Sequence, residues 1–430
     1  MKTNSSNLSA AQSARGVSGR RLHYAFVIVG CCCLMMGINV GLTFSCAGIF
    51  YRPVTESLGL SVGGFGLYMT AMYIASSLML PFAGRMLERY SSRMLFTAAS
   101  TLNGVALILM GCMSTLAGFY IAGALLGISI AFLLYMSYPT LINRWFHTRM
   151  GLMIGICCAA SGLGGIIFNP IGGYIIGEWG WRVGYWAFGA IILVIVTPLL
   201  ALWLRDYPHE LGLKKFGEDD SGNPAGSQAA EASSAMGLTY AQVIRMPVFY
   251  ALIAFAFIMM GCSTLNLFIP GYVQSVGFPL ETASMAAASA MAGVTLGKLL
   301  LGYINDRNCL LGVLLCTIGG AAGLLAVIWG HSWIAAILVG SFFFGWCYAG
   351  VTVQTAMLTK AVVGSRDYAR IFSIISIALS AGGAVASGGW GLLADATSYS
   401  LSFIVGAGLL LMATLLGLYS LAAARKLRPI

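Results

Sequence analysis

Charged residues are scarce in this chain. Only 8% of its 430 residues are Asp, Glu, Lys or Arg, whereas soluble domains carry about 25%. Hydrophobic residues make up 59%, so little polar material remains for a soluble surface or for linkers between soluble domains. These shortages exclude a cytosolic enzyme, a secreted domain and a disordered protein. The composition predicts an integral membrane protein.

The sequence also lacks motifs for nucleotide binding, catalysis and metal binding. The sequence has no Walker-type Gly-Lys-Ser/Thr, so we do not expect ATP to drive the protein. The apolar runs contain no Ser–His–Asp or Cys–His arrangement. The 11 cysteines lie almost entirely in apolar runs without metal-ligand spacing, which is typical of small buried hydrophobic residues. We therefore expect no enzymatic activity, no metal and no cofactor.

Long apolar runs are abundant. A helix needs about 20 apolar residues to cross a bilayer, and twelve such runs occur, approximately at 24–50, 62–83, 94–112, 116–142, 151–176, 183–204, 247–271, 282–304, 310–329, 332–358, 371–394 and 399–424. The short alternating segments of a membrane β-barrel are absent. We predict an all-α membrane protein with a tail at 1–23, a six-helix half at 24–204, a linker at 205–246, a second six-helix half at 247–424 and a tail at 425–430.

The basic residues predict the orientation. If both termini are cytoplasmic, 20 of the 23 Lys and Arg residues fall in cytoplasmic tails and loops, as the positive-inside rule requires. Only Arg52 and Arg182 fall on the other side, and Lys298 falls within a span. The net charge of +10 therefore indicates contact with anionic lipid headgroups rather than with nucleic acid. We expect a monomer in the plasma or inner membrane with cytoplasmic termini.

Two loops form an internal repeat. Gly84, Glu88 and Arg89 recur 218 residues later as Gly302, Asp306 and Arg307. The same offset joins further pairs in the loops after the first and seventh runs, Phe50 with Phe268, Ser57 with Ser275 and Gly59 with Gly277. Two parallel six-helix repeats are typical of secondary transporters.

The repeated stretches, GRMLERYSSR and GYINDR, resemble the loop signature of the major facilitator superfamily, Gly-x-x-x-Asp-Arg-x-Gly-Arg-Arg. Glu88 replaces the Asp in the first copy, and the second copy lacks the basic tail. The resemblance implies the twelve-helix major facilitator fold. The acid can cap a helix N-terminus or pair with a neighbouring Arg, which predicts a cytoplasmic latch; alternatively, these are only topology charges. The candidate gating residues are Glu88, Arg89, Arg93, Asp306 and Arg307.

A longer segment, NRWFHTRMGLMIGICCAASGLGGIIFNPIGGYIIGEWGWRVGYWAFG, resembles the monocarboxylate porter and oxalate–formate antiporter branch of that superfamily. The shared features are Arg-Trp-Phe, a Gly-rich fifth span and Gly-Trp-Arg before the sixth. This resemblance implies that the substrate is a small organic anion.

Lys298 is the one ionisable residue well inside a predicted span, about 12 Å deeper than Asp306 along a helix. A charge there costs at least roughly 2.5 kcal/mol unless it is paired or solvated, and no acid lies at similar depth. Lys298 therefore favours an anionic substrate, although its long stem could instead reach the headgroups. The resemblance supports the first interpretation, because related anion porters carry a basic residue here, mostly Arg. Oxalate-transporting members also carry a Lys in span 11, where this chain has Ile375 or Ser376; we therefore favour a monocarboxylate.

Polar and aromatic residues inside the spans are further candidates. Tyrosine hydroxyls can donate to a carboxylate while the rings form an apolar wall. For each such residue, helix packing is an equal alternative. The candidates for the substrate site besides Lys298 are Asn39, Tyr68, Tyr73, Tyr135, Tyr138, Asn266, Trp346 and Tyr348.

The sequence thus predicts a secondary transporter of small organic anions that works by rocker-switch alternating access. We favour anion exchange, because permanently charged Lys298 would make the empty carrier reluctant to close. Proton symport with Lys298 as the proton carrier remains open. So do transport of larger amphipathic carboxylates, such as bile-acid-like or drug anions, and a receptor or structural role on the same scaffold.

Overall fold

The computed structural model describes residues 23–217, 238–364 and 366–427. Nearly all of the predicted N-terminal tail, the middle of the predicted linker and the last three residues lie outside the described residues. Within the described part, twelve helices are long and apolar enough to cross a membrane. This number agrees with the twelve predicted spans.

The first half contains six membrane-length helical segments. Three of them include π-helical turns, so that one segment is built from several elements. The elements are α1 (Ala25–Leu34), η2 (Met35–Ser45), α2 (Gly48–Leu58), α3 (Val62–Arg89), α4 (Ser92–Cys112), α5 (Leu116–Ile130), η3 (Ala131–Met136), α6 (Ser137–Trp145), α7 (Met150–Trp179), α8 (Trp181–Ile191), η4 (Ile192–Val196) and α9 (Thr197–Trp203).

The second half repeats this order with fewer interruptions. Its elements are α12 (Pro247–Ser263), η6 (Thr264–Leu267), α13 (Ile269–Ser275), α14 (Leu280–Arg307), α15 (Cys309–Trp329), α16 (Ile334–Val363), α17 (Tyr368–Ala396) and α18 (Tyr399–Leu427). The ends of the predicted linker are folded, with η5 at Pro208–Leu211 and α11 at Tyr240–Val243. Phe216 also pairs with the first half, because its N–H donates to the Trp145 carbonyl at 2.9 Å.

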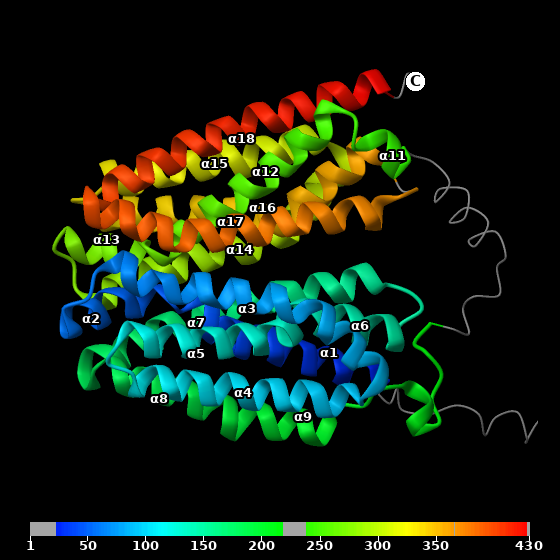
Figure 1. Cartoon of the computed structure of the whole chain (residues 1–430), viewed down its shortest axis with the longest axis horizontal. Helices are drawn as coiled ribbons and strands as arrows, with labels where there is room; N and C mark the ends of the chain where they lie inside the picture. The colour runs from blue at the N-terminus through cyan, green and yellow to red at the C-terminus, as the bar shows by residue number, and fades with distance from the viewer. Residues whose placement is uncertain (1–22, 218–237, 365, 428–430) are drawn as a thin grey trace, which may run out of the picture.

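The two halves form two stacked layers, blue to green and green to red in Figure 1. They meet along two helix pairs, α3 with α17 and α7 with α14. We call the end of the bundle with the connections 59–61, 113–115, 276–279 and 397–398 the far end, and the opposite end, with 146–149, 204–217 and 364–367, the linker end.

Internal symmetry extends beyond the loops. Helices α3 and α14 both have 28 residues, and they begin and end 218 residues apart. The first span of each half is also interrupted at an equivalent place, between η2 and α2 and again at η6. Gly48, which follows the first break, lies against the backbone of Leu267 in the second.

Small residues allow the helices to approach closely. A side chain at Gly164 would collide with the carbonyl oxygen of Gly37, and one at Gly293 with that of Phe342. In a bilayer, lipid gives no hydrophobic drive for helix association, so close backbone contact supplies the packing energy. Close approach of this kind explains glycines such as Gly164 and Gly293 in apolar spans.

Helices α3 and α14 extend beyond the apolar runs that predicted them. The candidate gating residues Glu88, Arg89, Asp306 and Arg307 therefore lie in the last helical turns rather than in loops. The prediction was short because it followed hydropathy, whereas backbone hydrogen bonding continues into the charged last turn.

Candidate substrate site

Lys298 lies in the second half of α14 and is partly exposed. Its ammonium donates to the carbonyl oxygen of Cys158 at 3.2 Å and to the hydroxyl of Ser161 at 3.0 Å. Both acceptors belong to α7, in the other half of the protein. Because both are neutral, they solvate the cation without cancelling its charge.

The α7 side of this contact is itself held in place. Ser161 donates its hydroxyl hydrogen to the Cys158 carbonyl at 2.8 Å, so its lone pairs remain for Lys298. The Ser161 carbonyl accepts from Ser45 of η2 at 3.2 Å. Asn169 in turn donates to the carbonyl of Ser45 at 3.2 Å. This chain of bonds fixes the acceptors of Lys298 against the interrupted first span.

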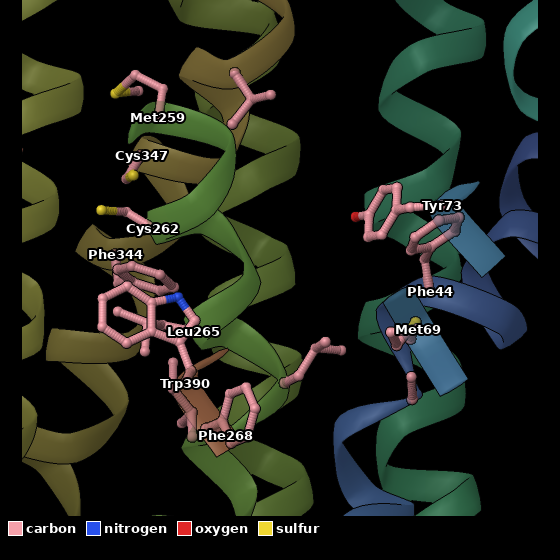
Figure 2. Close-up of a cluster of buried hydrophobic side chains, with 14 of the residues drawn as sticks. Phe44, Met69, Tyr73, Met259, Cys262, Leu265, Phe268, Phe344, Cys347 and Trp390 are labelled. Atoms are coloured by element: carbon pink, nitrogen blue, oxygen red, sulfur yellow. The ribbon is translucent and has the colours of Figure 1, made fainter. Parts of the chain in front are cut away.

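Three of the predicted tyrosines converge from both halves. Tyr73 of α3 lies within electrostatic range of Tyr135 of η3 and Tyr348 of α16. Figure 2 shows the Tyr73 hydroxyl pointing toward the second half, with Phe44 beside it; the two ring centroids are 5.7 Å apart. Tyr135 and Tyr348 are partly exposed in the middle of their spans. The group provides hydroxyl donors in an aromatic setting.

Two further candidates lie near Lys298. Tyr138 of α6 is next to Cys158, whose carbonyl binds the ammonium. Trp346 of α16 lies close to Gly297, the neighbour of Lys298 in the chain. The indole nitrogen of Trp346 is buried and has no hydrogen-bond partner. It is therefore a donor available for a ligand.

The remaining candidates have other surroundings. Asn39 is fully buried in the first half, where its side-chain oxygen accepts from Ser100 of α4 at 3.2 Å. Tyr68 packs in an aromatic cluster with Tyr51 and Phe65. Asn266 lies in the break at η6 with an unpartnered side-chain oxygen. These placements fit helix packing as well as ligand contact.

The candidate gating residues occupy the linker end. Glu88, Arg89, Asp306 and Arg307 are exposed, and Arg307 covers the ring of Tyr303 at 4.3 Å. Arg93 in the first turn of α4 is bonded instead, since its Nε donates to the Ala201 carbonyl at 2.6 Å.

Asp206 and Asp395 each cap a helix, and the sequence did not predict either role. Asp206 accepts from the backbone N–H groups of Ser92 and Arg93 at 2.9 and 2.8 Å, which is the capping role predicted for Glu88. At the far end, Asp395 of α17 accepts from the N–H groups of Val62 and Gly63 at 3.0 and 2.6 Å. The second cap joins the two halves. Neither has a sequence signal, because each partner lies more than 100 residues away.

Comparison with known proteins agrees with this architecture. Residues 32–312 and 251–429 match the family described as Major Facilitator Superfamily. A bacterial homologue of the human lysosomal transporter Spinster, in an inward-facing and unoccupied conformation, superposes with a TM-score of 0.69 at 16% identity, covering 95% of this chain and all of that one. The same homologue in an inward-facing and occupied conformation gives 0.67 at 14% identity, covering 94% of this chain and 97% of that one. At these identities the likeness concerns the fold alone.

Named relatives narrow the family. The probable transporter MCH2 of Saccharomyces cerevisiae is 26% identical over 270 residues, covering 62% of this chain and 47% of that protein. Monocarboxylate transporter 12-B of Danio rerio is 22% identical over 292 residues, covering 65% and 61%. Human monocarboxylate transporter 12 is 21% identical over 284 residues, covering 60% and 55%. The chain thus spans about half to three fifths of the length of these relatives. It belongs to the Major Facilitator Superfamily and is a multi-pass membrane transporter, not an enzyme, that resembles the monocarboxylate branch.

Proposed function

We propose that this transporter carries small monocarboxylates by alternating access and exchanges one anion for another. The observation that carries the proposal is Lys298, whose ammonium lies within a span and has two neutral acceptors. A charge inside the membrane costs at least about 2.5 kcal/mol when nothing compensates it. A substrate carboxylate supplies the opposite charge that the two acceptors lack.

The site favours one carboxylate over two. In α17, where oxalate-transporting relatives carry a second cation by the family resemblance, Ile375 is buried and Ser376 donates within its own helix to the Phe372 carbonyl at 2.9 Å. One cation neutralises one carboxylate. The hydroxyls of Tyr73, Tyr135 and Tyr348 add donors, and their rings suit a small organic tail.

Exchange follows from the charge of the empty site. An empty carrier must change conformation with Lys298 uncompensated, whereas a loaded carrier is neutral there. Proton symport is the second candidate, because Lys298 is the one basic or acidic residue deep within a span among the described residues. In that mechanism Lys298 releases its proton when the site is empty.

We also propose the cellular setting. By the positive-inside rule, the basic residues at the linker end favour a cytoplasmic location for that end, with both termini on that side of a plasma or inner membrane. The functional unit is a monomer with halves at 24–204 and 247–424, joined by the linker at 205–246.

A binding screen tests the substrate class. The purified protein is heated with formate, acetate, lactate, pyruvate, oxalate, succinate and cholate, and the unfolding temperature is recorded. A ligand that binds only the folded state at 100 times its Kd stabilises by about 2.7 kcal/mol. We expect stabilisation by small monocarboxylates. Stabilisation by cholate alone would instead favour large amphipathic anions.

A counterflow assay tests the mechanism. Proteoliposomes preloaded with unlabelled lactate should take up labelled lactate faster than empty vesicles, without a pH gradient. Uptake that requires an inward proton gradient and is indifferent to preloading would contradict exchange and support symport. Proteoliposomes containing the Lys360→Gln variant, which lacks an exposed charge, control for altered surface charge and should behave as the wild type does.

A further inference from the structure

We propose that Lys298 and Ser161 form a tether that locks the empty carrier, and that the substrate carboxylate opens the lock by drawing Lys298 away from α7. The inference rests on the proposed function, since it assigns the carboxylate to Lys298. It adds a role for Ser161, which becomes a positioning residue that competes with the substrate for the ammonium.

The tether joins the two halves by side-chain contact. Lys298 belongs to α14 and its two acceptors belong to α7. Ser161 is 7% exposed and its hydroxyl hydrogen is already committed to the Cys158 carbonyl. Its oxygen can therefore only accept from Lys298. A neutral acceptor holds an ammonium more weakly than a carboxylate does, so an arriving anion can displace it.

The contacts between α7 and α14 form a row that we call the seam, and the tether lies at its inner end. From the far end inward, α7 meets α14 where Gly173 lies against Ser284, Gly165 against Met291 and Gly162 against Thr295. Lys298 makes the next contact. One turn further toward the linker end, a side chain at Gly155 or Gly302 would meet no atom within 4 Å. These two glycines share the helix faces of Cys158 and Lys298, so the helices have separated there.

This position makes the tether specific to one conformation. Opening the far end requires α7 and α14 to separate along the seam, and that separation must break the bonds of Lys298. The other inter-half seam lies at the same end, where Asp395 caps α3 and Thr70 donates to the Ala384 carbonyl at 2.7 Å. The tether therefore stabilises the state closed at the far end, and its release favours the opposite state.

Exchange then has a structural cause. Without substrate, the carrier remains tethered and changes conformation slowly. With substrate, the carboxylate replaces Ser161 as the partner of Lys298, and the halves are free to move. Removing the Ser161 hydroxyl should weaken the lock in the empty protein and also remove a competitor for the ammonium.

The first experiment needs no ligand. Amide hydrogen exchange is measured for residues 62–70 and 384–395 in the wild type, Ser161→Ala and Lys298→Met. Ser161→Ala removes one of the two acceptors of Lys298 and should increase hydrogen exchange in these segments by about fivefold, the effect of losing one hydrogen bond. Lys298→Met removes both bonds and should increase hydrogen exchange at least as much, and the double variant should exchange no faster than Lys298→Met because the bond to Ser161 is already absent there. Ser284→Ala, at the same seam but bonded only to its own helix, should leave exchange unchanged. If both single variants show the same amide hydrogen exchange rates as the wild type, the tether is overturned.

The second experiment measures transport of labelled lactate. Ser161→Ala should raise uptake into empty vesicles by about fivefold and bring the stimulation by preloading close to one, while lactate binds no more weakly than to the wild type. If preloading stimulates uptake as strongly in Ser161→Ala as in the wild type, and the wild type exchanges anions as proposed, the tether is overturned and the proposed function stands. Failure of the wild type to bind any monocarboxylate would overturn the proposed function, and the hydrogen-exchange result would still decide whether the tether exists.

Discussion

Lys298 binds two neutral oxygens, and this determines what its substitution should do. Lys298→Gln keeps a hydrogen-bond donor but removes the charge that attracts a carboxylate. A hydrogen bond to a charged group contributes about 1.5–3 kcal/mol, so monocarboxylate affinity should fall at least about tenfold. Isothermal titration of the purified variant with the ligand found by thermal shift measures this loss.

Two further variants control this prediction. Lys298→Arg keeps the charge and should retain part of the affinity, although its planar guanidinium fits the two α7 acceptors differently. Lys360→Gln removes an exposed charge at the end of α16 and should bind as the wild type does. Normal affinity in Lys298→Gln would contradict the role of the cation.

For single residues, the sequence predicts the depth in the membrane better than the neighbours that the side chain contacts. The cost of a charge inside a span points to Lys298, and the structure gives it partners from the other half. Asn39 also lies deep in a span, yet its side chain bonds to Ser100 within the first half. A polar residue in an apolar run shows how deep it lies, but not which neighbour its helix face meets.

At the scale of elements, the close contact between α7 and η2 leads to a prediction about glycine. Gly164→Ala would place a methyl group against the backbone carbonyl of Gly37, which cannot move like a side chain. Overpacking of this kind costs about 1–3 kcal/mol, so the unfolding temperature should fall. Gly155→Ala, in the same helix, meets no atom within 4 Å and should be neutral or slightly stabilising. Equal melting temperatures for the two variants would show that the close approach is absent.

The cap on α3 gives a second prediction for an element. Asp395→Ala removes the acceptor of two N–H groups at the start of α3, and losing an N-cap costs about 0.5–2 kcal/mol. Because this cap comes from the other half, amide exchange at residues 62–66 should rise. Glu178→Ala removes another acid near the far end and should leave these amides protected. Protected amides in Asp395→Ala would rule out the cap.

Long apolar runs predicted every spanning helix, whereas the interruptions within them had no comparable signal. The sequence Met35–Ser45 is apolar and contains Gly37 and Gly41, but the structure makes it π-helical against α7. Its Gly41 lies against the backbone of Gly164 in α7, a contact between segments more than 100 residues apart that local composition does not indicate.

At the scale of the molecule, the halves contact one another at the far end, and the repeated acids lie exposed at the linker end. If Glu88 and Asp306 act when the linker end closes, Glu88→Ala and Asp306→Ala should slow turnover by about fivefold or more with little change in affinity. Comparing counterflow rates with titrated affinities separates the two effects. An affinity loss as large as that of Lys298→Gln, with normal turnover, would contradict the latch.

The overall architecture was predictable because a small number of strong rules govern membrane proteins. Apolar length gave the spans, and one offset of 218 residues, repeated in α3 and α14, gave the two halves. The conformation was not predictable. Whether the far end or the linker end is closed depends on small differences between contacts such as Asp395 with Gly63, and both states use the same sequence.

Among the described residues no acid pairs with Lys298, and this has a consequence for the membrane potential. If a monocarboxylate binds Lys298 as proposed, the loaded site is neutral, whereas the empty site carries one positive charge. A voltage across the membrane therefore acts on the empty carrier and not on the loaded one. One charge crossing the full field gains or loses about 2.3 kcal/mol per 100 mV, so an inside-negative potential would hold the empty site facing the cytoplasm while leaving one-for-one exchange of anions unaffected.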